Sequence, residues 1–350
     1  MTKRIQSLQS LRGIGFLLIF CSHCTFIDFF SSAWGGTGVS IFVVLSGFVV
    51  TLGYGYEDLR SDLKAVPYML KRVSKIFPLH IVMLCVRLLF DHLHGIETSG
   101  TVIFLNITML KSFIPVRDVY YSLGGVTWYL TLIWIFALLT PLLLKLLKKI
   151  GKRYTLFAFV LIILFRAVWI FYWHTSDNFQ WMSYINPFFR TTDYFLGMML
   201  GVNINTIKET IENTKMAYAI LSGVVWGTFL FYIVSLSITD MPWYHIYLRT
   251  PLSLGLIILF MCFNRFGALI RTLVYENKLL IYIGNISFEL FLIHIHVRNI
   301  VNYEFSRMDI NNSVVLLFVV FGVSVGLAQL YSYVDRKVRK TIYIKRKRQG

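Results

Sequence analysis

An arginine and a histidine stand eleven positions apart in the first apolar segment of the chain, LRGIGFLLIFCSHCTFI. At about 100° per residue, that separation brings Arg12 and His23 to one face of a helix, roughly 16 Å apart along its axis. An ionisable side chain at membrane depth is costly, so such a histidine indicates a lined cavity or a working site. A histidine packed against a neighbouring helix is the alternative. The pair predicts a helix face with a cation at the membrane edge and an imidazole near the middle of the bilayer.

Removal of a proton from a substrate hydroxyl and binding of an anionic group are chemistries that these residue types could perform. His23 suits the role of the base, because the ordinary pKa of an imidazole lies near neutral pH. Arg12, Arg72 and Lys75 share one predicted level, where they could hold the phosphates of a coenzyme. For Arg72 and Lys75, ordinary positive charge at the cytoplasmic face is the alternative.

The composition predicts the scaffold that must position these residues. Hydrophobic residues make up 57% of the 350 positions and charged residues only 15%, which predicts an all-α, polytopic membrane bundle. The apolar runs place about ten transmembrane helices at 12–31, 36–54, 75–91, 125–146, 154–173, 184–206, 216–237, 244–264, 279–300 and 313–334. The net charge of +17 does not indicate a nucleic-acid partner, because the basic residues cluster in the breaks between apolar runs.

The distribution of lysine and arginine predicts the topology. Both termini are expected in the cytoplasm, since that arrangement collects most basic loops on one side. Residues 1–335 then form the membrane domain, and 336–350 form a basic cytoplasmic tail that contacts membrane lipids. Between the third and fourth spans, Thr101 to Leu110 is too short to cross and predicts a re-entrant or interfacial helix. No hydrolase-like domain is expected after the tenth span.

Several smaller patterns carry alternatives of their own. Arg190 and Asp193 are three residues apart within an apolar run, so they predict either a substrate contact or a structural ion pair. Ser46 and Gly47 lie mid-span, where a hydroxyl can line a cavity and a glycine allows close helix approach. The glycines at 35, 36 and 38 predict a tight turn. The four cysteines fall inside apolar spans and are expected as packed thiols, so no metal site is predicted.

A set of motifs in the same order along the chain resembles acyltransferase family 3, the membrane O-acyltransferases. The motifs are Arg12-x10-His23, Gly35-Gly36-Thr37-Gly38-Val39, Leu45-Ser46-Gly47-Phe48, Arg72-x-x-Lys75-Ile76-x-Pro78, Asn186-Pro187-Phe188-Phe189-Arg190 with Asp193-Tyr194-Phe195-Leu196-Gly197, and Ile286-Ser287-Phe288-x-Leu290-Phe291-Leu292-x-His294. Lysine replaces the second arginine of the family's basic segment at position 75. Where many relatives carry WSLxxE, this chain has Trp128-Tyr129-Leu130 leading to Ile133, so no role for that acid carries over.

The resemblance implies an enzyme of the bacterial inner (plasma) membrane. It would move an acetyl group from cytoplasmic acetyl-CoA, the donor substrate, to a hydroxyl of a cell-surface polysaccharide or its lipid-linked precursor, with no bound cofactor. It implies a catalytic role for His23, Arg12 and His294, substrate contacts for Arg72, Lys75, Ser46, Arg190 and Asp193, and glycan-assembly proteins as partners. The alternatives are a multispan transporter or flippase for a lipid-linked sugar and a receptor-like membrane protein.

Overall fold

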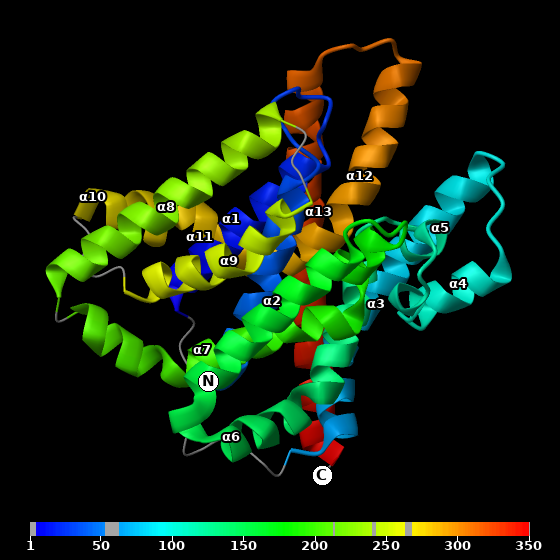
Figure 1. Ribbon diagram of the computed structural model, residues 1–350. Coiled ribbons are helices and arrows are strands. Elements are labelled where there is room, and N and C mark those ends of the chain that lie inside the picture. Colours follow the sequence, from blue (N-terminus) through cyan, green and yellow to red (C-terminus); the bar gives the residue numbers. More distant parts are fainter. Residues whose placement is uncertain (1–4, 53–62, 213, 240–242, 263–267, 350) are drawn as a thin grey trace.

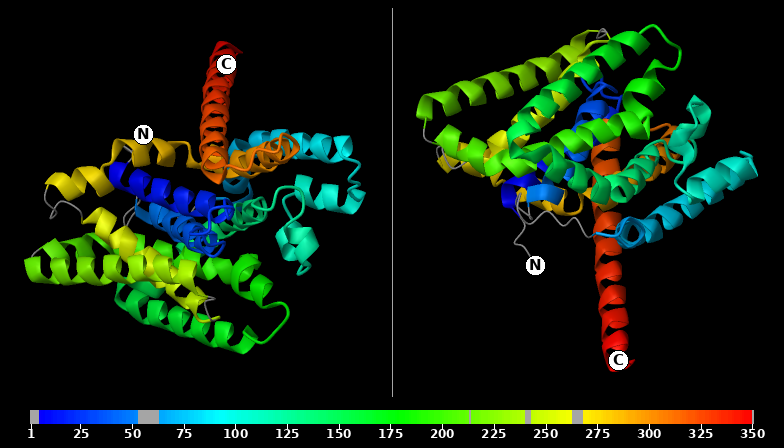
Figure 2. Two further views of the ribbon diagram at one scale, coloured as in Figure 1. Left: turned by 90° about the horizontal axis from the view of Figure 1, so that it is seen from above. Right: turned by 60° about the horizontal axis from the view of Figure 1, so that its bottom comes forward.

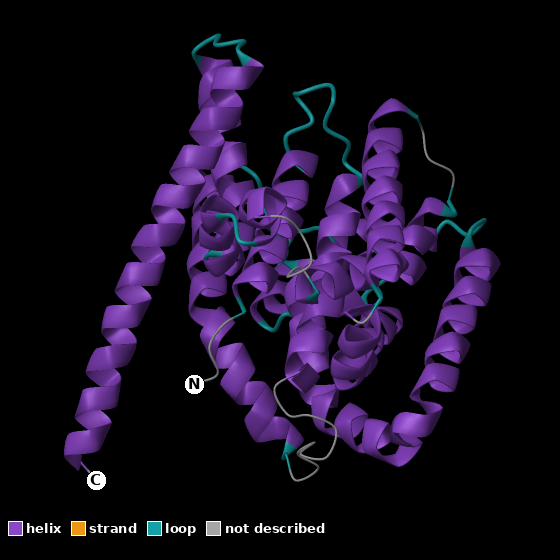
Figure 3. Ribbon diagram, turned by 90° about the vertical axis from the view of Figure 1, so that its left-hand side faces the viewer, coloured by secondary structure: helices purple, strands orange, loops and turns teal. Residues whose placement is uncertain are grey.

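The computed structural model describes residues 5–52, 63–212, 214–239, 243–262 and 268–349. These residues form helices joined by loops and contain no strand (Figure 1, Figure 3). The prediction of an all-α protein is therefore confirmed.

The helices follow one another along the chain with short connections. They are α1 (Gln6–Ser22), α2 (Trp34–Leu52), α3 (Ala65–Leu93), α4 (Gly100–Ile107), α5 (Arg117–Tyr120), α6 (Trp128–Trp173), α7 (Pro187–Glu212), α8 (Lys215–Ile238), α9 (His245–Met261), α10 (Ala268–Ile270), α11 (Lys278–Asn285), α12 (Ser287–Arg307) and α13 (Ser313–Gln349). A 3-10 turn spans Lys111–Phe113, and π-helical turns span Trp181–Ile185 and Arg271–Tyr275. Helix α6 breaks at Gly151, whose φ of 73° divides it into two helical arms.

Five of the helices in the described part are long and apolar enough to cross a bilayer. The number is six if α11 and α12, which meet at a bend of 60°, are parts of one span. This pattern indicates a multi-pass membrane protein. The count of ten spans and the cytoplasmic position of both termini stay predictions.

The first helix ends earlier than the sequence indicated. The expected span was 12–31, whereas α1 runs from Gln6 to Ser22 and His23 is its C-cap. The Nδ1 atom of His23 lies 2.7 Å from the carbonyl oxygen of Ile19 and satisfies one of the acceptors exposed at a helix end. The following residues form successive turns, with backbone bonds from Cys24 to Cys21 and from Ile27 to Cys24. The imidazole therefore lies at the end of α1 and not within a longer helix.

The expected tight turn at the glycines is also wrong, because Gly35, Gly36 and Gly38 belong to the beginning of α2. They are needed for close packing. A Cβ at Gly38 would lie 2.4 Å from the backbone oxygen of Gly15 in α1. On the other side of α2, a Cβ at Gly47 would lie 1.9 Å from the backbone oxygen of Tyr194 in α7. Small residues thus let α2 pack tightly between α1 and α7.

The segment between α3 and α6 folds back onto the bundle. The predicted short helix is confirmed as α4. The buried Lys111 donates hydrogen bonds of 2.6 Å to the carbonyl oxygen of Ser122 and to the hydroxyl of Thr127. Ser112 donates to the carbonyl oxygen of Trp128 at the beginning of α6. These contacts hold the loop that follows α5 against the bundle.

The expected tail at 336–350 continues α13 without a break, as far as Gln349. The end of this helix projects from the body of the bundle (Figure 2). The positive charge at its end is therefore carried on a helix and not on an extended segment.

Candidate active site

Two histidines from opposite ends of the chain meet at the end of α1. Atom Nε2 of His294, in α12, lies 3.3 Å from Nδ1 of His23, and the ring centroids are 5.1 Å apart. His294 is fully buried and packs edge-on against Phe16 at 5.7 Å, whereas His23 is half-buried. The structure thus brings together the two histidines that the sequence singled out.

The hydrogen bonds assign a tautomer to each ring. Nδ1 of His294 lies 2.9 Å from the carbonyl oxygen of Leu290, so this nitrogen carries the hydrogen and Nε2 carries the lone pair. Nδ1 of His23 faces two acceptors, this Nε2 and the carbonyl oxygen of Ile19, so it also carries a hydrogen. The lone pair of His23 is then on Nε2. That atom is available to accept a proton from a substrate.

A cavity of about 510 Å³, here called the His23 cavity, lies beside this pair. Its wall includes the C-terminal end of α1, the N-terminal end of α2, the loop after α5 and the beginning of α9. The polar lining residues are Ser22, His23, Ser32, Arg117, Tyr121, Gln180, Ser183, Tyr184, His245 and Arg249. Within the part of the chain that the structure describes, no aspartate or glutamate occurs in this lining. The cavity therefore combines a base with a cationic wall.

A second cavity of about 210 Å³, here called the Arg12 cavity, is lined by Arg12, Arg72, Ser46, Tyr129 and Tyr194 together with apolar residues. Among the described residues, its lining also contains no acidic side chain. Arg12 is thus in a different cavity from His23, although both residues belong to the same stretch of chain.

One buried side chain contributes to both cavities. Phe291 lines each of them, and its ring centroid lies 5.3 Å from that of Tyr129 and 6.3 Å from that of His294. Among the described residues, Phe291 is the one that the two linings share.

Of the other basic and hydroxyl candidates, some line a cavity and one does not. Ser46 lines the Arg12 cavity and donates its hydroxyl hydrogen to the carbonyl oxygen of Phe42 at 2.7 Å. Lys75 is exposed and does not line either cavity, although it follows Arg72 by only three residues on α3. The structure therefore places Arg72 in the same cavity as Arg12, whereas Lys75 lies outside that cavity.

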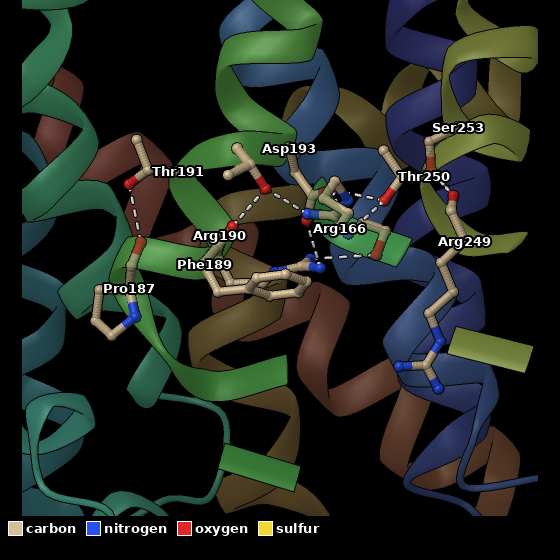
Figure 4. A network of polar contacts seen from close by, with 11 residues as sticks. Arg166, Pro187, Phe189, Arg190, Thr191, Asp193, Arg249, Thr250 and Ser253 are labelled. Carbon is tan, nitrogen blue, oxygen red and sulfur yellow. Dashed lines mark hydrogen bonds and ion pairs between the residues drawn. The ribbon is translucent and has the colours of Figure 1, made fainter. Parts of the chain in front are cut away.

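Arg190 and Asp193 belong to a buried cluster of three charges (Figure 4). Asp193 forms ion pairs with Arg190 at 2.6 Å and with Arg166, in α6, at 2.9 Å. The hydroxyl of Thr250 donates to the same carboxylate at 2.6 Å, and Arg190 also donates to Ser40 at 3.1 Å. The cluster joins α2, α6, α7 and α9. Neither Arg190 nor Asp193 lines either cavity, so the geometry favours the structural alternative for this pair.

Arg249 in the His23 cavity escaped the sequence analysis. Its signal was present, since it is a charged residue inside the predicted span 244–264. His245 precedes it by four residues, which places both on one face of α9. An arginine close to the end of a span looks like an ordinary interfacial charge, and only the fold shows that it faces a cavity.

The profile of acyltransferase family 3, described as an acyltransferase domain, matches residues 5–333. The chain belongs to this family. The matched region includes every candidate site residue from Arg12 to His294. Acyltransferase MdmB of Streptomyces mycarofaciens is 27% identical over 166 residues, which are 43% of this chain and 42% of that protein. The chain thus aligns with less than half of this relative's length, and no solved structure gives a significant match.

Membership of acyltransferase family 3 confirms the resemblance stated from the motifs. Transfer of an acyl group, the reaction for which the family is named, requires two substrates, and the His23 and Arg12 cavities both have charged side chains in their linings.

Proposed function

We propose that the protein transfers an acetyl group from cytoplasmic acetyl-CoA to a hydroxyl of a cell-surface polysaccharide or its lipid-linked precursor, in the bacterial inner membrane. The observation that carries this proposal is a pair of cavities that share Phe291 in their linings, with His23 at one and two arginines at the other. In the predicted topology, the Arg12 cavity faces the cytoplasm and the His23 cavity faces the outside.

The two cavities divide the substrates between them. At about 210 Å³, the Arg12 cavity is too small for a whole coenzyme A but suits its pantetheine arm. Arg72 is exposed at this cavity, where a guanidinium can bind phosphate oxygens through two hydrogen bonds. The larger His23 cavity accepts the hydroxyl-bearing sugar. The acyl group then crosses the plane of Phe291 while the coenzyme stays on the cytoplasmic side.

The proposed reaction uses His23 as the base. The acceptor oxygen attacks the thioester carbonyl carbon as Nε2 of His23 takes the hydroxyl proton, and His294 stabilises the resulting imidazolium through its Nε2 lone pair. The carbon–sulfur bond breaks, and the leaving thiolate takes the proton back from His23. The products are an ester and coenzyme A thiol, and both histidines return to their starting state.

Sealed vesicles of known orientation test the proposal. Acetyl-CoA enclosed on the cytoplasmic side should support acetylation of an acceptor on the outer side, and acetyl-CoA added only to the outer side should not. A transporter or flippase would instead move the unmodified lipid-linked sugar and release no coenzyme A thiol. Equal activity with donor on either side would contradict the division of substrates proposed here.

Replacement of Arg72 by alanine is expected to raise the KM for acetyl-CoA about tenfold or more, because a charge-assisted contact to phosphate is lost. The turnover number should change little. Lys75→Ala is the matched control on the same helix, since Lys75 is exposed and outside the cavity. Steady-state kinetics of the purified variants give both constants. If Lys75→Ala raised the KM as strongly as Arg72→Ala, the donor would lie along α3 and outside the cavity.

Replacement of Phe291 by alanine is expected to accelerate hydrolysis of acetyl-CoA in the absence of an acceptor. Phe291 belongs to the linings of both cavities, and in the proposed arrangement its loss lets water from the His23 cavity reach the thioester. Release of coenzyme A thiol measures this reaction. Loss of a buried phenyl ring costs about 3–5 kcal/mol of stability, so Phe291→Leu, which keeps most of the bulk, is the control. An unchanged rate of hydrolysis in a folded Phe291→Ala protein would show that the ring is not the barrier.

A further inference from the structure

The wall of the His23 cavity contains Arg249, whose buried positive charge suits it to bind an anion. The side chain is 6% exposed, and its Nε atom has no hydrogen-bond partner. The contacts that the structure gives its guanidinium are the Nε2 atom of His245 at 3.1 Å and the ring of Tyr184, whose centroid is 5.4 Å away. Neither contact neutralises the charge. A buried arginine normally pairs with a carboxylate or phosphate, because an unpaired charge is costly away from water.

The nearby charge cluster gives its two arginines a countercharge that Arg249 lacks within the described part of the chain. Arg166 and Arg190 share the carboxylate of Asp193. Arg249 lies one residue before Thr250, which donates to that same carboxylate, yet its side chain extends away from the cluster (Figure 4). It points instead into the cavity that it lines.

The beginning of α2 provides a second feature of the same wall. Gly35 and Gly36 line the cavity, and the guanidinium carbon of Arg249 occupies the place of a Gly36 side chain, 2.4 Å from where a Cβ would be. The absence of a side chain at position 36 is therefore what admits the arginine. A helix N-terminus carries partial positive charge, so the guanidinium of Arg249 lies beside the positive end of α2. One anion bound at this side of the cavity would stabilise both positive charges.

The remaining lining strengthens the same preference. Arg117, exposed in α5, adds a second cation to the cavity, and none of the described residues that line it is an aspartate or glutamate. A cavity with low-dielectric walls and charges of one sign concentrates ligands of the opposite sign. An acceptor that was a neutral sugar would leave Arg249 without a countercharge.

We propose that the acceptor sugar carries an anionic group, a carboxylate or a phosphate, that binds Arg249 at the beginning of α2 while the hydroxyl to be acylated faces His23. The identification of this ligand as the acceptor rests on the proposed function, whereas the anion site itself depends only on the cavity. Arg249 sets substrate specificity in this scheme and takes no part in proton transfer.

Binding to the full-length protein in nanodiscs, without acetyl-CoA, tests the anion site. The probes are methyl glucoside, methyl glucuronide and glucose 1-phosphate, which present a neutral sugar, a carboxylate and a phosphate. At least one anionic probe should bind about tenfold or more tightly than the neutral sugar. The stronger of the two anionic probes identifies carboxylate or phosphate as the natural group. Equal binding of all three by the wild-type protein would overturn the proposal.

Variants then assign the preference to Arg249. Arg249→Gln should remove it, and Arg249→Lys should retain part of it, because the charge is kept but the forked geometry is lost. The matched control is Arg307→Gln, at an exposed arginine at the end of α12 that does not line the cavity. Anion preference that persists in a folded Arg249→Gln protein would overturn the assignment. If Arg249→Gln does not fold, the comparison of the three probes on the wild-type protein and Arg249→Lys still decides.

The same proteins separate this inference from the proposed function. Anion preference without any transfer from acetyl-CoA would leave the site in place and contradict the acetyltransferase proposal. If transfer occurs, Arg249→Gln should raise the KM for anionic acceptors and not the KM for neutral acceptors. An equal loss of turnover with neutral and anionic acceptors would place Arg249 in the chemistry and overturn its role in specificity.

Discussion

Replacement of His23 by alanine is expected to lower the turnover of acyl transfer by about 10²–10⁴-fold, the usual contribution of a general base. The Nε2 lone pair of His23 is the proton acceptor that the hydrogen-bond network leaves available at the cavity. The side chain lies at the end of α1 and its loss removes one capping hydrogen bond, so the amount of membrane-inserted protein should stay near normal. Transfer kinetics and quantification of the purified protein measure the two effects.

His294 provides the companion test, because in the proposed mechanism it acts through His23 as a positioning residue. His294→Leu should lower turnover, whereas His294→Gln should retain more activity, since a glutamine oxygen can still accept the hydrogen on Nδ1 of His23. A merely structural role would make the two substitutions equally harmful. Near-normal transfer by the His23→Ala protein would remove the imidazole from the mechanism and favour the carrier alternative.

Replacement of Asp193 by asparagine is expected to destabilise the protein by about 3–5 kcal/mol, because it leaves two buried arginines facing a neutral group. Arg166 and Arg190 both pair with this one carboxylate, and all three side chains are almost completely buried. Loss of either arginine should cost less, since the other would still form a one-to-one pair. Thermal unfolding of the detergent-purified variants measures the difference.

Asp335→Asn in α13 is the matched control. It removes a carboxylate from an arginine at the same distance, 2.6 Å, but the pair with Arg339 is exposed. Exposed pairs contribute about 0–1 kcal/mol, so this change should be nearly neutral. If Asp193→Asn left unfolding unchanged while abolishing transfer, the cluster would belong to the substrate-binding machinery and not to the scaffold.

The sequence by itself determined the helical character and the main candidates for chemistry. Apolar runs long enough for a bilayer and charges confined to their breaks predict helices, because a lipid-exposed backbone must satisfy its own hydrogen bonds. The same patterns marked His23 and His294, and their motifs identified the family. Element boundaries were less secure. The end of α1 depends on the bond from His23 to the carbonyl oxygen of Ile19, and apolar character continues beyond that point.

Only the tertiary structure decided how these residues combine. Helical periodicity tells which residues share a face, but not which helix packs against that face, so the contact between His23 and His294 across 271 positions was not predictable. For the same reason, the sequence did not show that Arg166 lies beside Asp193. Nor did it show that Arg12 and His23 line two different cavities. The glycine pattern could not distinguish a tight turn from a close helix contact, because both require a residue without a side chain. The fold assigns Gly38 to the contact between α1 and α2 and Gly36 to the space occupied by Arg249.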